Sequence, residues 1–182
     1  DRPPFHIVGP AINIPVEEIR DIFLQKNIID KPTLDPAELG YAARRFLRDK
    51  FQRLEMGITG VNLAVAETGT IINVENEGNI RFNKSTPKIQ VSIMSLEKVV
   101  STMQDALHLL RLLCRSCTGQ KLSAYVTLDS GPKTTDEIDG PEEFYIVIVD
   151  NGRSDFYADP KAREVLQCIR CDFCCGIGGL RL

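Results

Sequence analysis

Closely spaced cysteines near the carboxyl end are the residues of this sequence best suited to chemistry. Cys168, Cys171 and Cys174 follow one another with two residues between each pair. This spacing matches the first three positions of the bacterial ferredoxin run, whose thiolates hold the irons of a [4Fe-4S] cluster within a tight loop. We therefore predict that these three side chains are ligands of an iron-sulfur cluster.

The fourth position of the ferredoxin run is not a cysteine in this sequence. The run places its last cysteine three residues after the third and before a proline, and this chain has Gly178 and Gly179 there. Cys175 adjoins Cys174, and adjacent residues reach one cluster only with strain. The motif predicts three ligands and leaves open whether this chain alone holds an intact cluster. Zinc bound by four thiolates is the alternative metal.

The other cysteines and the two histidines form no recognisable catalytic set. Cys114 and Cys117 have the spacing of a redox pair. However, Cys114 falls on the apolar face of a predicted helix, where a free cysteine packs as a small hydrophobic side chain. His6 and His108 have no partner pattern of the kind that a Ser-His-Asp or Cys-His mechanism requires. We predict a packing role for Cys114 and no histidine-dependent nucleophile.

A second candidate site consists of carboxylates around a predicted strand at residues 70–74. Glu75 and Glu77 lie where this strand ends in a glycine turn, and Glu67 precedes the strand. Ligands commonly bind at such strand ends in α/β sheets, so Glu67 and Glu77 are candidates for a nucleophile or a general base. The alternative interpretation is a solvated turn, with Glu67 and Glu77 at opposite ends of the strand or on separate loops.

Residues 78–85 differ from a phosphate-binding P-loop by one residue. Asn83 replaces the second glycine of the motif, whose conformational freedom lets backbone amides surround a phosphate. Pro87 follows soon afterwards and opposes the long helix that a P-loop precedes. We therefore do not predict nucleotide binding at this segment.

Composition narrows the class of protein. The 182 residues are 43% hydrophobic and 26% charged, which is typical of a soluble globular domain. The net charge of -3, without a basic block, argues against nucleic-acid binding, and no apolar run is long enough to span a membrane. The chain opens with Asp1 and has no signal-peptide pattern, so we expect that its true start is missing. Its six cysteines are grouped instead of being spread through the chain as in a secreted disulfide scaffold, so we expect that its thiols work in a reducing compartment.

Alternating helices and strands are expected to position these residues. Hydrophobic periodicity, caps and turn residues predict helices at 16–27, 36–54, 96–114 and 160–167, an apolar segment at 61–66, and strands at 70–74, 88–94, 122–128 and 144–149. Ser95 is the predicted N-cap of the third helix, and the apolar run at 144–149 is typical of a sheet covered on both faces. The order of elements predicts an α/β domain with a largely parallel sheet.

Several separated stretches resemble one family, the iron-sulfur B subunit of the bacterial lactate-utilization system, which contains a LUD domain. The stretches are GITGVNLAVAETG at 57–69, ENEGN at 75–79, MSLEK at 94–98, TGQ at 118–120, GPEEF at 140–144, VDNGR at 149–153, ADP at 158–160 and CIRC at 168–171. Their order and spacing match the family from about residue 5 to residue 174.

The resemblance implies a fold similar to the sugar-phosphate isomerase and CoA-transferase class, with helices on both faces of a mostly parallel sheet. Residues 1–165 would then form a LUD-type α/β domain without its N-terminal part. Residues 166–182 would begin a ferredoxin-type segment that is truncated or degenerate. The chain is thus expected to be an internal fragment or a damaged copy, with a truncation scar or reading error at 175–182.

The resemblance also implies a function. It predicts a cytoplasmic electron-transfer component in the oxidation of L-lactate to pyruvate, working with two partner subunits. By position, Cys168, Cys171 and Cys174 would bind the cluster, while Gly178 interrupts the ligand set. An alternative is that the α/β domain is itself an enzyme or binding module for a small organic acid or CoA thioester through Glu67 or Glu77. A scaffold domain without chemistry of its own is the third option.

Overall fold

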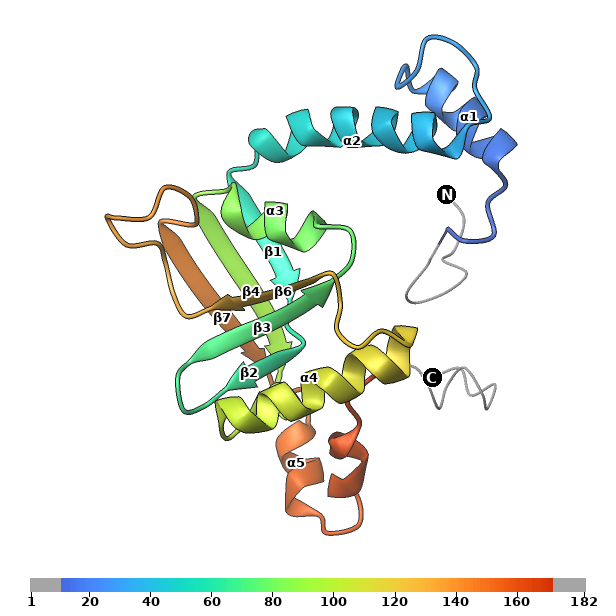
Figure 1. Cartoon of the computed structure of the whole chain (residues 1–182). Helices are drawn as coiled ribbons and strands as arrows, with labels where there is room; N and C mark the ends of the chain where they lie inside the picture. The colour runs from blue at the N-terminus through green and yellow to red at the C-terminus, as the bar shows by residue number, and fades with distance from the viewer. Residues whose placement is uncertain (1–10, 172–182) are drawn as a thin grey trace. The chain divides into compact units, whose positions relative to one another are not determined.

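The computed structural model describes residues 11–171, and Figure 1 traces their helices and strands. The chain divides into two compact units, Asp1–Gln52 and Arg53–Leu182. His6, Cys174, Cys175 and Gly178, which the sequence analysis singled out, lie outside the described residues. The predicted boundary at residue 165 stays a prediction.

Two helices form the described part of the first unit. Helix α1 (Val16–Gln25) follows Pro15 and carries two glutamates in its first turn, where the helix dipole favours anions. Helix α2 (Pro36–Gln52) begins with a proline, and the Asp35 carboxylate accepts a hydrogen bond from Ala37 N at 2.8 Å. Both predicted helix starts are confirmed, and both helices end two residues earlier than predicted.

A three-stranded parallel sheet begins the second unit. It contains β1 (Met56–Gly60), β4 (Ile89–Ser95) and β7 (Glu143–Val149) in the order β1-β4-β7. Strand β1 was not predicted. Its Gly57 is required by close packing, because a Cβ atom there would lie 1.9 Å from the Asn83 carbonyl of helix α3 (Asn79–Ser85). Helix α3 therefore lies directly against β1.

A second, mixed sheet has the order β5-β2-β3-β6. Its strands are β2 (Leu63–Val65), β3 (Thr70–Glu75), β5 (Val99–Val100) and β6 (Tyr125–Asp129). Strand β3 pairs antiparallel with both β2 and β6, whereas β2 and β5 are parallel. Three of the five strand pairs among the described residues are parallel. The predicted α/β class with mostly parallel pairing and flanking helices is confirmed, while the antiparallel pairing around β3 was not foreseen.

The central strands β2 and β3 of the mixed sheet are buried on both faces. Helix α4 (Met103–Thr118) packs on one face, where Ala106 and Leu110 join Leu63, Val65 and Ile72 in a core cluster; Figure 1 shows α4 running along β2 and β3. On the other face, Ala64 and Ile71 pack with Met94 of the parallel sheet. This double coverage explains why five of the six residues of β3 are buried.

The predicted helix at 96–114 begins too early and is corrected by the structure. Leu96–Lys98 is a short 3-10 turn, and Val99–Val100 is strand β5. Helix α4 starts only at Met103, where Thr102 and Asp105 form a capping box. The apolar residues before Thr102 continue the helical spacing by coincidence, because β5 uses them to pair with β2.

The C-terminal part of the described chain also differs from its prediction. Helix α5 (Arg153–Ala158) was not predicted, and the expected helix at 160–167 is a 3-10 helix, η2, at Arg163–Gln167. The reason is local, since the Asp159 carboxylate accepts a hydrogen bond from Lys161 N at 2.8 Å and closes a turn before η2. Within residues 11–171, no helix has the length and apolar content needed to cross a lipid bilayer.

Candidate functional site

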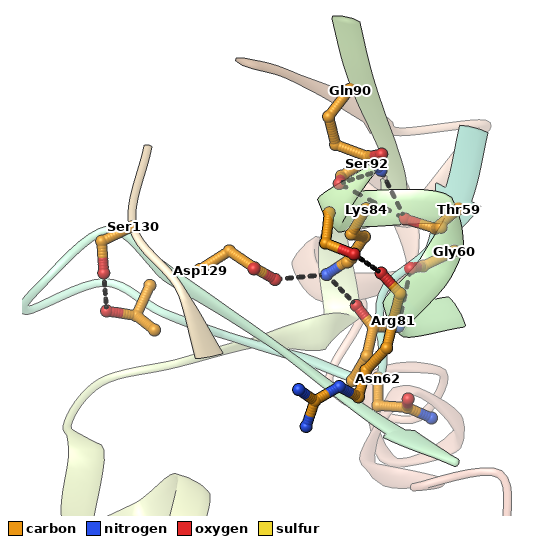
Figure 2. Close-up of polar contacts among 12 residues, drawn as sticks. Thr59, Gly60, Asn62, Arg81, Lys84, Gln90, Ser92, Asp129 and Ser130 are labelled. Atoms are coloured by element: carbon orange, nitrogen blue, oxygen red, sulfur yellow. Dashed lines mark hydrogen bonds and ion pairs between the residues drawn. The ribbon is translucent and has the colours of Figure 1, made fainter. Parts of the chain in front are cut away.

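A buried cluster of polar side chains lies between the two sheets beside α3, and we call Lys84, Asn73 and Asp129 the Lys84 cluster. The Lys84 side chain is 4% exposed, pairs with Asp129, and donates a hydrogen bond to Asn73 Oδ1 at 2.6 Å. Asn73 Nδ2 donates in turn to the Gly60 carbonyl at 2.8 Å. Figure 2 shows Lys84 pointing toward Asp129. The buried ammonium is thus paired, as burial of a charge requires.

A second group of buried polar side chains adjoins this cluster on the parallel sheet. Gln90 Nε2 donates to Thr59 Oγ1 at 2.8 Å and to Ser92 Oγ at 3.3 Å (Figure 2). Gln90 and Ser92 are fully buried. The inner face of β4 therefore carries amide and hydroxyl groups instead of an apolar row. The Gln90 amide nitrogen is satisfied by these hydroxyls, whereas Gln90 Oε1 is buried without a hydrogen-bond partner among the described residues.

Glu75 is the buried carboxylate among the predicted acidic residues. Its two side-chain oxygens accept hydrogen bonds from Ile80 N at 2.7 Å and Arg81 N at 2.8 Å. These amides belong to the first turn of α3, where backbone donors lack intrahelical partners. Glu75 therefore fixes the start of α3 on the end of β3, and with it the position of Lys84.

The structure does not bring Glu67 and Glu77 together. Glu67 precedes β3 and accepts a hydrogen bond from Met103 N, the first residue of α4, at 3.2 Å. Glu77 is exposed in the turn between β3 and α3. The six residues of β3 separate the two carboxylates by roughly 20 Å of strand. They cannot act on one substrate bond as a pair, so each would act alone.

The contact with α4 leads to a test of Glu67. Replacing Glu67 by Gln is expected to lower the free energy of unfolding by about 0.5 kcal/mol, because the charge is lost from a helix N-terminus. Glu77→Gln is the matched control and should leave the thermal unfolding midpoint unchanged. Equal midpoints for both variants would show that Glu67 contributes nothing to the start of α4.

The described cysteines of the C-terminal segment are free thiols. Cys168 follows η2 and is exposed, and Cys171 is half-buried. Cys114 is 3% exposed in the α4 core, which confirms its predicted packing role, and Cys117 is exposed. Among residues 11–171, no three His, Cys, Asp or Glu side chains converge as metal ligands. Cys174 lies beyond that range, so the described part holds two of the three predicted cluster ligands.

Glu97 connects the cysteine segment to the parallel sheet. Its side chain is 2% exposed, and it pairs with Arg153 Nε of α5 and with Arg170, each at 2.5 Å. Ser95 Oγ donates a further hydrogen bond at 2.7 Å. Burial alone would raise the pKa of Glu97, but the bond from Ser95 and the Arg153 guanidinium outweigh it and hold this pKa below its ordinary value. Glu97 is therefore a carboxylate that anchors two arginines.

A cavity of about 260 Å³, partly open to solvent, adjoins this anchor. Its polar lining includes Asn62, Lys98, Tyr157, Arg163, Gln167 and Cys168, and its apolar lining comes from β2, β5, α4 and the segment around η2. Burial, followed by the nearby charge of Arg170, lowers the pKa of Lys98. We call this space the Cys168 cavity.

Sequence reasoning missed the Lys84 cluster, Glu97 and the Cys168 cavity. A signal for two of them was present, because Asn62 lies in the 57–69 stretch and Glu97 and Lys98 lie in the 94–98 stretch that carry the family resemblance. That resemblance marks the positions as family features without showing which side chains they meet.

Comparison with known proteins agrees with the sequence motifs. Residues 6–149 match the family model described as the LUD domain. The chain is 47% identical to Lactate utilization protein B of Anoxybacillus flavithermus over 96% of its own length and 37% of that protein. The corresponding protein of Bacillus cytotoxicus is 49% identical over 96% of this chain and 36% of its own. The chain thus spans little more than a third of these relatives.

A solved structure also shows some similarity. It is the crystal structure of a DUF162 family protein from Deinococcus radiodurans, with 20% sequence identity and a TM-score of 0.43. The match covers 56% of this chain and 57% of that protein.

Proposed function

Because this chain belongs to the LUD-domain family, as its motifs predicted, we propose that it is an electron-transfer component of a cytoplasmic lactate-utilization system. The observation that carries the proposal is 47% identity to a Lactate utilization protein B along 96% of the chain. The reaction served would be the oxidation of L-lactate to pyruvate. The partners would be the other subunits of that system.

The thiols of the C-terminal segment suit an iron-sulfur cluster in their chemistry. Thiolates are the usual protein ligands of these clusters, and both Cys168 and Cys171 are free and not fully buried. Cys174 would be the third ligand, while Gly178 occupies the position of the fourth. When bound, the cluster supplies one-electron transfer.

The chain's own residues would hold this segment and set its charge. Glu97 binds Arg170, which lies between Cys168 and Cys171 in the sequence. Lys98 lines the same cavity as Cys168. Positive charge near an iron-sulfur cluster favours its reduced form, because net charge is one determinant of reduction potential. The role proposed for Glu97 is thus to position a cationic, cysteine-bearing segment against the α/β domain.

Anaerobic reconstitution of the full chain with iron and sulfide tests the cluster. We expect about three to four irons per chain and a broad visible absorption shoulder. The Cys168→Ser variant should lose most of this iron, whereas Cys117→Ser, which changes an exposed thiol on α4, should retain it. Absence of iron from the unaltered chain, or full iron in Cys168→Ser, would overturn the cluster assignment.

An enzymatic role through Glu67 or Glu77 stays a prediction. Glu67 already accepts a backbone hydrogen bond at the start of α4, and Glu77 lies at the other end of β3. Their separation argues against a reaction that uses both carboxylates, whereas a role for either one alone is left as an alternative.

A further inference from the structure

We propose that the Cys168 cavity binds a small organic acid, with its carboxylate held by Lys98 and Arg163 and its carbon skeleton against the apolar wall. The cavity and its lining residues are features of the structure that do not depend on the proposed function. Only the choice of acids used as probes below rests on the proposed function.

The charge lining the cavity favours an anion. Lys98 and Arg163 both line it, and in the described part of the chain neither has a carboxylate within 4.0 Å, although the charge of Glu97 acts on Lys98 from farther away. Glu97 is the acidic residue of the lining, and it is already paired with Arg153 and Arg170. The two remaining cations therefore give the cavity an excess of positive charge that an anionic ligand would neutralise.

Size and the apolar wall narrow the class of anion. A volume of about 260 Å³ is below the ~300–1,000 Å³ typical of pockets for drug-sized ligands. Leu109 of α4 and Leu166 of η2 are among the apolar lining residues, and they can cover a short carbon chain that an inorganic anion lacks. The geometry thus selects a small carboxylic acid over free phosphate.

Polar groups around the cavity can bind an oxygen next to the carboxylate. Asn62, Gln167 and Tyr157 all line the cavity. Their side chains carry amide or hydroxyl donors, and the Asn62 side chain also accepts a hydrogen bond from Val74 N through Oδ1. A 2-hydroxy or 2-oxo acid offers an acceptor at that position. Because Cys168 also lines the cavity, such an acid would bind beside the segment to which the cluster is assigned.

Calorimetric titration of the full chain, without iron, with L-lactate, pyruvate and inorganic phosphate tests this inference. We expect heat of binding with at least one of the two acids and none with phosphate at the same concentration. Lys98→Met and Arg163→Met should each weaken binding about tenfold or more, since each removes a charge-assisted hydrogen bond. Lys88→Met, an exposed lysine at the opposite end of β4, is the matched control and should bind as the unaltered chain does.

Thiol alkylation of the unaltered chain locates the bound acid. It requires no variant, so its result does not depend on how the variants fold. A saturating acid should slow iodoacetamide labelling of Cys168 several-fold, measured by peptide mass spectrometry, and leave Cys117 unaffected. Binding of neither acid, binding of phosphate alone, or equal labelling of Cys168 with and without acid would overturn the inference. These measurements use iron-free protein, so their failure is distinguishable from failure of the cluster reconstitution.

Discussion

Replacing Lys84 by Met is expected to lower the free energy of unfolding by about 3 kcal/mol, measured by urea denaturation. The Lys84 side chain is 4% exposed, and its ammonium is the partner of Asp129. Removing the buried lysine leaves the Asp129 carboxylate, whose side chain is 22% exposed, without its compensating charge in a poorly solvated site. Asn73 Oδ1 also loses the donor that it meets at 2.6 Å. The variant should therefore lose contacts that join α3, β3 and β6.

A double-mutant cycle separates this pairing from the loss of lysine packing. Asp129→Asn removes the opposite charge, and Lys84→Met/Asp129→Asn should be more stable than the sum of the two single changes predicts. Lys88→Met, an exposed lysine nearby in the sequence, serves as the control and should change stability by less than about 0.5 kcal/mol. Additive single changes, with no coupling, would rule out a stabilising role for the pair.

The Lys84 cluster shows why the interior of this fold was hard to predict. The alternation at 88–94 correctly predicted a strand, β4, with Ile89, Val91 and Ile93 on one face. In the structure the buried face instead carries Gln90, Ser92 and Met94, and Ile93 is 42% exposed. Side-chain period identifies a strand, but burial of its polar face depends on partners from β1 that no local pattern reveals.

Strand β7 gives a related lesson. Its apolar run predicted a strand, which is confirmed, and suggested cover on both faces. Tyr145 and Ile148 are nevertheless 51% and 57% exposed among the described residues. Hydrophobicity shows that a strand can be covered, whereas the element that covers it must be found in the structure.

The candidate site was predictable only where its signal is local. Two-residue spacing makes Cys168 and Cys171 visible in the sequence, because neighbouring ligands leave a short motif. The pair between Glu97 and Arg170 joins residues 73 positions apart and leaves none. The same holds for Lys98 and Arg163, which approach one cavity from separate elements. Local patterns therefore identified the reactive groups and missed the charges that surround them.

Replacing Glu97 by Gln is expected to destabilise the C-terminal segment by about 2 kcal/mol, because two arginines lose a carboxylate whose side chain is 2% exposed. Hydrogen exchange measured by mass spectrometry should speed up in α5 and η2 and remain unchanged in α2. Arg170→Gln is the graded control: this arginine side chain is 56% exposed, so its loss should have a smaller effect. Unchanged exchange in α5 would contradict the anchoring role of Glu97.

The pH dependence of the same anchor provides an independent check, because the pKa of Glu97 is lower in the folded protein than its ordinary value of 4.5. A carboxylate with a lowered folded pKa contributes its full stability above the unfolded value and loses it as pH falls through the folded value. The ratio of the exchange rate of Glu97→Gln to that of the unaltered chain, in which the intrinsic pH dependence of amide exchange cancels, should therefore stay constant from neutral pH down to about pH 5 and then fall toward one. A ratio that falls on the alkaline side would instead assign the stabilising charge to a group other than this carboxylate.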